Sequence, residues 1–366
     1  MHIAFLISSL SKGGSERVLV NLADYLVNRG HQVTVVTQYQ KEDEYPLNKK
    51  AKRILSDITA AETTGSRIRN FYRRFMKLRR IWQNPRGDGE KPDIILSFIG
   101  MNNFMAIITS RFLKIPAVVA VRCAPHTEYT TRFMRNAANF LFRFADGVIY
   151  QTEAYHSFFS DAVNRRAIVL KNPMNPAFFR PRYQGEREKT IVNTSRVVSY
   201  KNQRLLIKAF DRIAEKFPEY ELIIYGEGDM RTMLVDEVSE LGLSGRIHLP
   251  GPSDRLHEVI YRATVHVLSS DFEGSPNALI EAMLLGLTCL AVDCAGGGPA
   301  ELIKPGKNGL LTPLNDVDKM AENLQYLLEN PDIAAQMGAE AHQLQEALKI
   351  EKIGADWEKY LMGKVK

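Results

Sequence analysis

Hydrophobic residues in the first 170 positions follow a pattern that predicts strands alternating with helices. Residues 2–8 form an almost continuous apolar run, as expected for a parallel strand covered on both faces. Gly13 and Gly14 follow, and apolar residues at helical spacing then predict a helix over residues 15–29. Further strands are predicted at 32–37, 94–98, 117–121 and 147–151. This order of strand, glycine loop, helix and strand is how a Rossmann-like domain begins.

A second series of the same kind begins near residue 190. Its predicted strands and helices lie at 191–195, 202–216, 221–226, 229–241, 246–249, 256–263, 265–268, 277–285 and 288–292. Pro173 and Pro176 lie between the two series and predict a stiff linker. We therefore predict an α/β protein with two Rossmann-like domains whose parallel sheets face an interdomain cleft. The predicted domains are residues 1–172 and 188–345, followed by a C-terminal helix over 346–366.

The composition is that of an ordinary globular protein, but its charge is unevenly distributed. A length of 366 residues suggests two domains at roughly 150 residues each. The three cysteines have the spacing neither of metal ligands nor of a disulfide framework. We expect no secretory leader, and no apolar run reaches the roughly 18 residues of a membrane span. Residues 1–170 carry 25 Lys and Arg against 14 Asp and Glu, a net charge of +11, whereas the remainder is acidic. An anionic surface or acceptor is therefore expected near the first half, and no recognition motif supports nucleic acid.

Two glutamates, Glu273 and Glu281, are separated by seven residues that contain a predicted turn and helix start. Gly274 and Ser275 suit the turn, and Pro276 suits the first helical position. The free N–H groups at a helix start favour an anion such as a phosphate. The segment thus offers two acceptors for hydroxyl groups beside one phosphate site, groups that a sugar nucleotide carries together. The alternative is an exposed helix acid and a helix-cap acid.

A pair of cations follows the first predicted strand of the second domain. Arg196 and Lys201 could stabilise the negative charge that develops on a departing diphosphate, or they could form a solvated basic turn. Glycines at 13–14 and 296–298 follow other strands and allow close approach of the backbone to a ligand, or simply make tight turns. The first glycine pair is not a G-x-G-x-x-G fingerprint, which argues against a dinucleotide cofactor.

Taken in order, these elements resemble the family 4 retaining glycosyltransferases of the GT-B fold. Ser195 replaces the glycine that the family usually carries before its arginine. The resemblance implies that Glu273, Arg196 and Lys201 are catalytic. It further implies a donor site made by Gly13, Gly14, Arg196, Lys201, Glu273, Gly274, Asn277, Ala278, Glu281, Gly297 and Gly298. It also implies that the final helix returns to the first domain.

The resemblance predicts transfer of a sugar from a nucleotide sugar, a UDP-sugar, to a glycan acceptor that is carried on a lipid. No metal and no other cofactor is expected, because Arg and Lys would do the electrostatic work of a cation. The family often has a histidine after the strand at 117–121, where this chain has Arg122. Arg122 and His126 are therefore candidates for contact with phosphate or acceptor. No general base is evident, so we predict a front-face reaction in which the leaving phosphate takes the acceptor proton.

Residues 66–82 predict a basic amphipathic helix with aromatic side chains. Such a helix suits an anionic membrane surface, and the candidates for this contact are Arg73, Arg74, Arg79, Arg80 and Trp82. The alternative is a packed helix with a solvated basic face. Residues 132–144 add a second apolar and basic stretch. We predict a cytoplasmic enzyme attached peripherally to the inner face of the cell membrane.

Two other functions fit parts of this pattern. A non-catalytic subunit of the same architecture would bind a partner or membrane, although all four residues whose loss would indicate it are present: Arg196, Lys201, Glu273 and Glu281. A nucleotide-sugar epimerase shares the two-domain architecture but carries a different set of acids and histidines. The sugar, the linkage and the oligomeric state are not encoded in any motif that we recognise.

Overall fold

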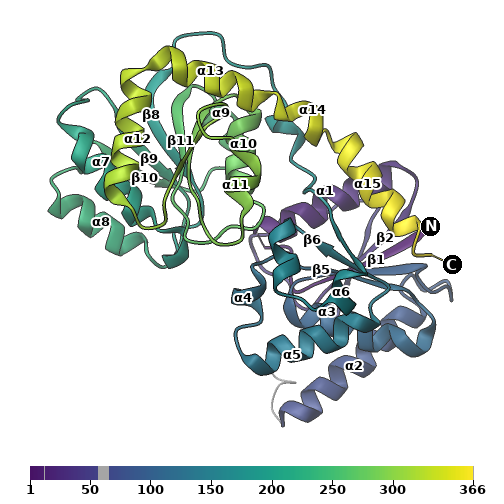
Figure 1. The fold of residues 1–366 in the computed structure, drawn as a ribbon. Helices are drawn as coiled ribbons and strands as arrows, with labels where there is room; N and C mark the ends of the chain where they lie inside the picture. The colour runs from purple at the N-terminus through teal and green to yellow at the C-terminus, as the bar shows by residue number, and fades with distance from the viewer. Residues whose placement is uncertain (12, 57–65, 366) are drawn as a thin grey trace. The chain divides into compact units, whose positions relative to one another are not determined.

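The structure, a computed structural model, describes residues 1–11, 13–56 and 66–365, and the chain divides into two compact units (Figure 1). Unit 1 comprises Met1–Pro173 together with Ile350–Lys366, and unit 2 comprises Met174–Lys349. Each unit has its own parallel sheet with helices packed on it. Within the described residues, no helix is both long and apolar enough to span a bilayer.

The sheet of unit 1 is built from short strands, of which the inner ones are buried and the two edge strands are only partly buried. They are β1 (His2–Ile7), β2 (Gln32–Thr37), β3 (Lys52–Leu55), β4 (Ile94–Phe98), β5 (Ala117–Ala120), β6 (Gly147–Tyr150) and β7 (Ala167–Val169). Their order across the described part of the sheet is β3-β2-β1-β4-β5-β6-β7, and every neighbouring pair is parallel. β1 lies near the centre and is buried along its whole length, which explains its continuous apolar run.

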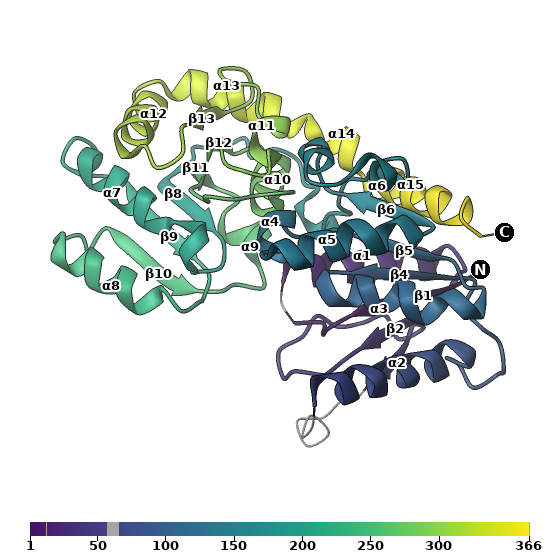
Figure 2. The ribbon, with the colours of Figure 1, turned by 60° about the horizontal axis from the view of Figure 1, so that its bottom comes forward.

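Helices connect these strands and cover the sheet (Figure 2). They are α1 (Gly14–Asn28), α2 (Arg67–Gln83), α3 (Gly100–Ser110), η1 (Arg111–Leu113), α4 (Pro125–Glu128), α5 (Arg132–Leu141), η2 (Phe142–Phe144), η3 (Glu153–Ser157), α6 (Asp161–Asn164) and α15 (Ile350–Met362). α3 packs on β4 and β5 and also contacts α2 and α5. α2 and α5 are thus neighbours of the same central helix.

The last helix, α15, belongs to unit 1 although it follows unit 2 in the sequence. Its Trp357 is fully buried, stacks on Phe98 of β4 with ring centroids 6.3 Å apart, and donates its indole N–H to the Lys171 carbonyl at 2.9 Å. The neighbouring Glu358 accepts from His31 at 2.7 Å and pairs with Arg29 at 3.3 Å. These contacts join the two ends of the chain within one unit.

Unit 2 repeats the architecture with a six-stranded parallel sheet in its described residues. Its strands are β8 (Glu188–Thr194), β9 (Glu221–Tyr225), β10 (Ile247–Gly251), β11 (Ala263–Leu268), β12 (Thr288–Val292) and β13 (Leu310–Thr312), in the order β10-β9-β8-β11-β12-β13. β8, β11 and β12 are therefore adjacent in the sheet. Their carboxyl ends meet at one edge, where ligands of open parallel sheets bind.

The helices of unit 2 alternate with its strands. They are η4 (Pro176–Phe178), η5 (Ser199–Lys201), α7 (Gln203–Ala214), α8 (Arg231–Glu240), α9 (Leu256–Val259), α10 (Asn277–Leu284), α11 (Gly298–Leu302), α12 (Val317–Glu329), α13 (Pro331–His342) and α14 (Leu344–Leu348). The helix predicted over 256–263 is too long. α9 ends at Val259 because the chain must turn before β11 begins at Ala263.

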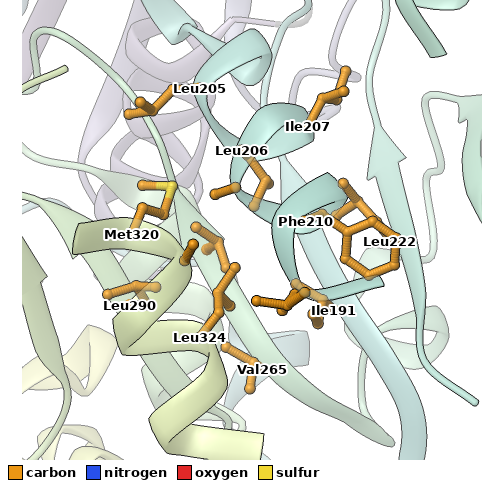
Figure 3. Packing of buried hydrophobic residues seen from close by; sticks show 14 of the residues in the cluster. Ile191, Leu205, Leu206, Ile207, Phe210, Leu222, Val265, Leu290, Met320 and Leu324 are labelled. Atoms are coloured by element: carbon orange, nitrogen blue, oxygen red, sulfur yellow. The ribbon is translucent and has the colours of Figure 1, made fainter. Parts of the chain in front are cut away.

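The core of unit 2 lies between its sheet and the pair α7 and α12. Figure 3 shows Leu206 and Phe210 of α7 gathered with Met320 and Leu324 of α12, all at most 1% exposed. The spacing of the α7 residues, four apart, puts both on the face that meets the sheet. This packing holds η5 and the start of α7 rigidly against the carboxyl end of β8.

Candidate functional site

Three segments that follow adjacent strands build the candidate site of unit 2. Residues 195–202 follow β8, residues 269–277 follow β11, and residues 293–298 follow β12. The backbones of the last two segments are joined, since Phe272 and Ala295 form a parallel bridge and Glu273 N–H donates to the Ala295 carbonyl at 3.0 Å. The sheet thereby brings together residues that are about 100 positions apart in the sequence.

Lys201 and Glu273 are in direct contact. Lys201 Nζ lies 2.5 Å from Glu273 Oε1, and the two side chains are 15% and 10% exposed. Ser270 donates a further hydrogen bond to the same carboxylate oxygen at 2.7 Å, and Ser269 donates to the Lys201 carbonyl at 2.9 Å. The pair is thus held at the strand end with a defined geometry. A charged pair that is mostly, but not fully, buried can exchange one partner for a charged ligand.

Arg196 lies beside this pair but is more exposed to solvent. Its guanidinium donates to the hydroxyl of Tyr200 and lies 5.8 Å from the centre of that ring, while Lys201 Nζ lies 5.4 Å from the same centre. Asp271 N–H donates to the Tyr200 carbonyl at 2.9 Å, which ties η5 to the segment after β11. Tyr200 therefore organises both predicted cations, a role that sequence reasoning missed.

Glu281 is only 2% exposed and lies in the second turn of α10, as predicted. Asn277 and Ala278 form the first turn of this helix, and both are partly exposed. Pro276 precedes the helix as its N-cap, so the prediction that it occupies the first helical position is wrong by one residue. A buried carboxylate on a helix is uncommon unless it has a specific role or partner. Its burial argues against the alternative of an exposed helix acid.

The glycine segment after β12 approaches the loop after β11 so closely that side chains cannot fit. A Cβ atom at Gly298 would lie 1.7 Å from the Gly274 carbonyl oxygen, and one at Gly296 would lie 2.3 Å from the Glu273 carbonyl oxygen. Gly296 and Gly297 also adopt positive φ angles of 99° and 72°. These glycines are required for the strand ends to meet, whether or not a ligand binds there.

The predicted site residues of unit 1 are placed by its own sheet. Gly13 is the N-cap of α1, and Gly14 is the first residue of that helix. The helix therefore begins one residue earlier than predicted. As the N-cap, Gly13 has no side chain with which to cap the helix, and the first turn contains Glu16.

Arg122 lies at the carboxyl end of β5 and is only 4% exposed. Its guanidinium donates to the Asn172 side chain and lies 5.6 Å and 5.7 Å from the ring centres of Phe98 and Trp357. Burial lowers the pKa of Arg122 to about 10. His126 is exposed and packs edge-on against Phe158. The structure therefore does not bring these two candidates together: Arg122 packs under α15, and His126 lies on the surface.

The predicted membrane residues of α2 fall on two different faces. Trp82 is fully buried and donates to Thr109 at 2.9 Å, so the prediction that Trp82 meets a membrane is wrong. Arg74 also points inward, where it donates to Asn102 at 2.7 Å, and burial lowers its pKa to about 10. The reason is that positions 74, 78 and 82 share the helix face that packs toward α3. Arg73 and Arg80 are exposed.

Glu128 is a largely buried carboxylate in unit 1 that sequence reasoning missed. Its carboxylate accepts from the Gly100 N–H and from the Tyr129 hydroxyl. The turn before Gly100 is strained, because Ile99 adopts a φ of 69° that β-branched residues rarely take. Burial is the main cause that raises the pKa of Glu128 to about 7. No sequence motif marks this residue, because its backbone partner Gly100 follows another strand, β4.

Glu128→Gln is expected to stabilise the protein increasingly as the pH rises. The folded pKa of about 7 lies above the ordinary value of 4.5, so the contribution of the neutral carboxyl is complete below about pH 4.5 and is lost as the pH rises through 7. The difference between variant and parent should reach at most ~3 kcal/mol in the free energy of unfolding. Urea unfolding at pH 5, 7 and 8.5 measures it. The exposed Glu90→Gln is the control, and parallel pH profiles for Glu128→Gln and the parent would contradict the assignment.

In the described residues, no three His, Cys, Asp or Glu side chains gather in a way that could hold a metal ion. What unit 2 does assemble is a cationic pair, two buried carboxylates and a glycine segment at one sheet edge. Such a set can bind a phosphorylated ligand and accept hydrogen bonds from hydroxyl groups.

Comparison with known proteins identifies the family. A model described as glycosyl transferase 4-like domain matches residues 13–172, and one described as glycosyl transferases group 1 matches residues 176–344. The chain is 26% identical over 368 residues to the GalNAc-alpha-(1->4)-GalNAc-alpha-(1->3)-diNAcBac-PP-undecaprenol alpha-1,4-N-acetyl-D-galactosaminyltransferase of Campylobacter jejuni, covering 99% of this chain and 98% of that enzyme. It is 22% identical over 311 residues to the amylovoran biosynthesis glycosyltransferase AmsD of Erwinia amylovora, covering 82% and 83% of the two chains.

A solved structure shares the fold over the full length. The crystal structure of HepE from Anabaena, in complex with UDP-glucose, has a TM-score of 0.82 at 19% identity, covering 99% of this chain and 100% of that one. The two family models together span nearly all of the sequence, and both parallel-sheet units have the expected architecture. The predicted family and fold are thereby confirmed: this chain belongs to the family 4 glycosyltransferases and has the GT-B fold.

Proposed function

We propose that the chain is a retaining, metal-independent glycosyltransferase that moves a sugar from a UDP-sugar to a glycan acceptor carried on a lipid, in the synthesis of cell-surface polysaccharide or glycoconjugate. The observation that carries the donor assignment is the contact of Lys201 with Glu273 at one sheet edge of unit 2, with Arg196 beside it and the buried Glu281 on the helix that follows. The Campylobacter relative is named for an undecaprenyl diphosphate-linked acceptor, and HepE was solved with UDP-glucose. Both support the proposed substrate classes.

In this proposal the cations act on the leaving group. The bond between the anomeric carbon and the diphosphate breaks with its electron pair going to the phosphate oxygen, where Arg196 and Lys201 stabilise the new charge. The acceptor oxygen bonds to the same face of that carbon, and its proton passes to the leaving phosphate. Fixed cations that meet this charge make a metal unnecessary. Lys201 leaves Glu273 for the diphosphate, and Glu273 is then available to the hydroxyls of the transferred sugar.

The other predicted contacts have defined places in this scheme. Glu281 accepts hydrogen bonds from the ribose hydroxyls, and the amides near Gly297 and Gly298 face the donor sugar. The donor contacts implied for Gly13 and Gly14 stay a prediction. Arg122 and His126 remain candidates for phosphate or acceptor, although the burial of Arg122 requires that a ligand displace part of its surroundings. The enzyme is cytoplasmic and attaches to the inner face of the membrane through the exposed cations of α2.

Isothermal titration of the full chain with UDP, GDP, ADP and their sugars, without added metal, tests the donor site. We expect one nucleotide class to bind, and Glu281→Ala and Arg196→Ala each to weaken it by roughly ten-fold or more, since each removes a charged hydrogen-bonding group. Arg204→Ala is the matched control, because Arg204 is exposed on α7 and forms an ion pair with Glu237 of α8. Absence of binding to every nucleotide would favour a non-catalytic subunit.

A further inference from the structure

Unit 1 exposes a row of phenylalanine side chains to solvent. Phe133 and Phe140 on α5 are 78% and 57% exposed, Phe144 in η2 is 39% exposed, and Phe112 in η1 is 81% exposed. We refer to these four residues as the phenylalanine ridge. Single exposed apolar residues are ordinary, whereas a contiguous apolar row on the surface indicates an interaction site.

The ridge is continuous rather than scattered. Phe133, Phe140 and Phe144 are seven and four positions apart, so they lie along one side of α5 and its extension η2. The rings of Phe140 and Phe144 meet edge-on with centroids 5.3 Å apart. The Arg111 guanidinium lies 4.8 Å from the centre of the Phe144 ring, which places η1 and its Phe112 beside the row.

The opposite side of the same helix already has its core partners. Ala138 and Phe142 are fully buried, and Phe142 packs on Phe104 and Tyr129 with centroids 6.0 Å away in each case. The helix therefore does not need its phenylalanine side to fold against unit 1. Exposing these rings to water must have another use, or it would be a liability for solubility.

Charge around the ridge is mostly positive. Residues 99–146 contain six Lys and Arg against two acids: Glu128, which is turned inward to the Gly100 N–H, and the exposed Asp146, whose carboxylate accepts from the Ala117 N–H at 2.9 Å. The exposed cations of the segment are Arg111, Lys114, Arg132, Arg135 and Arg143. An apolar aromatic row bordered by cations complements an anionic lipid surface, with rings at the acyl boundary and cations at the phosphates.

We propose that the phenylalanine ridge inserts into an anionic bilayer and is the apolar anchor of unit 1. The inference deepens the proposed membrane attachment, which assigned only electrostatic contact to α2, and it rests on that part of the proposed function. A second copy of the chain fits the surface less well, because a symmetric contact would place five exposed cations opposite the same five, with only Asp146 among them.

Vesicle flotation tests the anchor. The full chain is mixed with vesicles of phosphatidylcholine and phosphatidylglycerol, or of phosphatidylcholine alone, at 0.15 M and about 0.5 M NaCl, salt levels that differ in their screening of surface charge. The double variant Phe133→Ser, Phe140→Ser should bind the anionic vesicles at least about ten-fold more weakly than the parent. Val235→Ser, Val259→Ser in unit 2 is the matched control, since these side chains are 44% and 41% exposed and lie outside the ridge.

A tryptophan reporter measures insertion directly. The two natural tryptophans, Trp82 and Trp357, are fully buried, so Phe133→Trp adds the only solvent-exposed indole of the variant in its described residues. Its emission should shift to shorter wavelength when anionic vesicles are added. An unshifted spectrum with bound protein, or equal binding by the double serine variant and the parent, would overturn the proposal.

Two further measurements separate the possible failures. Sedimentation without lipid that finds the parent dimeric and Phe133→Ser, Phe140→Ser monomeric would overturn the bilayer assignment in favour of self-association. Nucleotide titration of the same variant should match the parent, because none of the predicted donor residues lies on α5. If nucleotides bind neither protein while vesicle binding follows the ridge, the donor assignment fails and the anchor stands.

Discussion

Lys201→Met is expected to reduce kcat/KM for sugar transfer by roughly 10²–10³-fold, the usual loss when one fixed donor to a developing negative charge is removed. Lys201 is held 2.5 Å from Glu273 at the end of β8, so its ammonium group is positioned before the donor arrives. The variant also leaves Glu273 without its cation in a mostly buried position. Transfer assays with the donor class found by titration measure the loss.

The contact between Lys201 and Glu273 predicts that the effects of replacing them are not independent. Glu273→Gln should also reduce kcat/KM, but the double variant should lose far less than the product of the two single losses, because each single change disturbs the same pair. Lys208→Met is the matched control, since Lys208 is exposed on α7. Additive losses would show that Lys201 and Glu273 act independently, and an active Lys201→Met would remove Lys201 from the proposed mechanism.

Trp357→Ala is expected to lower the free energy of unfolding of unit 1 by roughly 3–5 kcal/mol, the range for removing a large aromatic side chain from a core. The fully buried ring packs against both Phe98 and the Arg122 guanidinium, and its N–H donates to the Lys171 carbonyl. The variant leaves a cavity beside a buried cation. Urea unfolding followed by the fluorescence of Trp82 reports on unit 1 specifically, because both tryptophans of the chain lie in it.

Met362→Ala, on the same helix but 54% exposed, controls for general effects on α15. Nucleotide binding by unit 2 is expected to survive in Trp357→Ala under conditions where both units are folded. An unchanged free energy of unfolding for unit 1 would mean that α15 contributes little to its stability. The contact of Trp357 with Phe98 of β4 would then not stabilise the unit.

The hydrophobic pattern predicted the inner strands of both sheets and also the edge strand β10. A buried parallel strand needs apolar residues on both faces, so β1, β4 and β12 leave a run in the sequence that cannot be missed. β3, β7 and β13 were not predicted. Each lies at a sheet edge and is short and only partly buried, so its residues carry no such run.

The candidate site divides in the same way. Chemistry and family resemblance pointed to the cations and glutamates, because charged residues and glycines after strands are visible in a linear sequence. Ser270 and Tyr200, which organise them, are ordinary residue types that bond within their own segments. Only the adjacency of β8 and β11 joins these segments, through Lys201 with Glu273 and the Asp271 N–H with the Tyr200 carbonyl. Glu128 acquires its raised pKa in the same manner, from burial against a turn that follows another strand.

The α2 helix marks the limit of what this sequence determines. The sequence by itself determined that residues 66–82 form a basic amphipathic helix. It also determined that the chain alternates strands and helices in two series, because both results follow from the spacing of apolar residues. Only the tertiary structure decided that Trp82 and Arg74 face α3, and that the exposed aromatic row lies on α5. Periodicity tells which side chains share a face, but the neighbouring elements decide whether protein or solvent covers it.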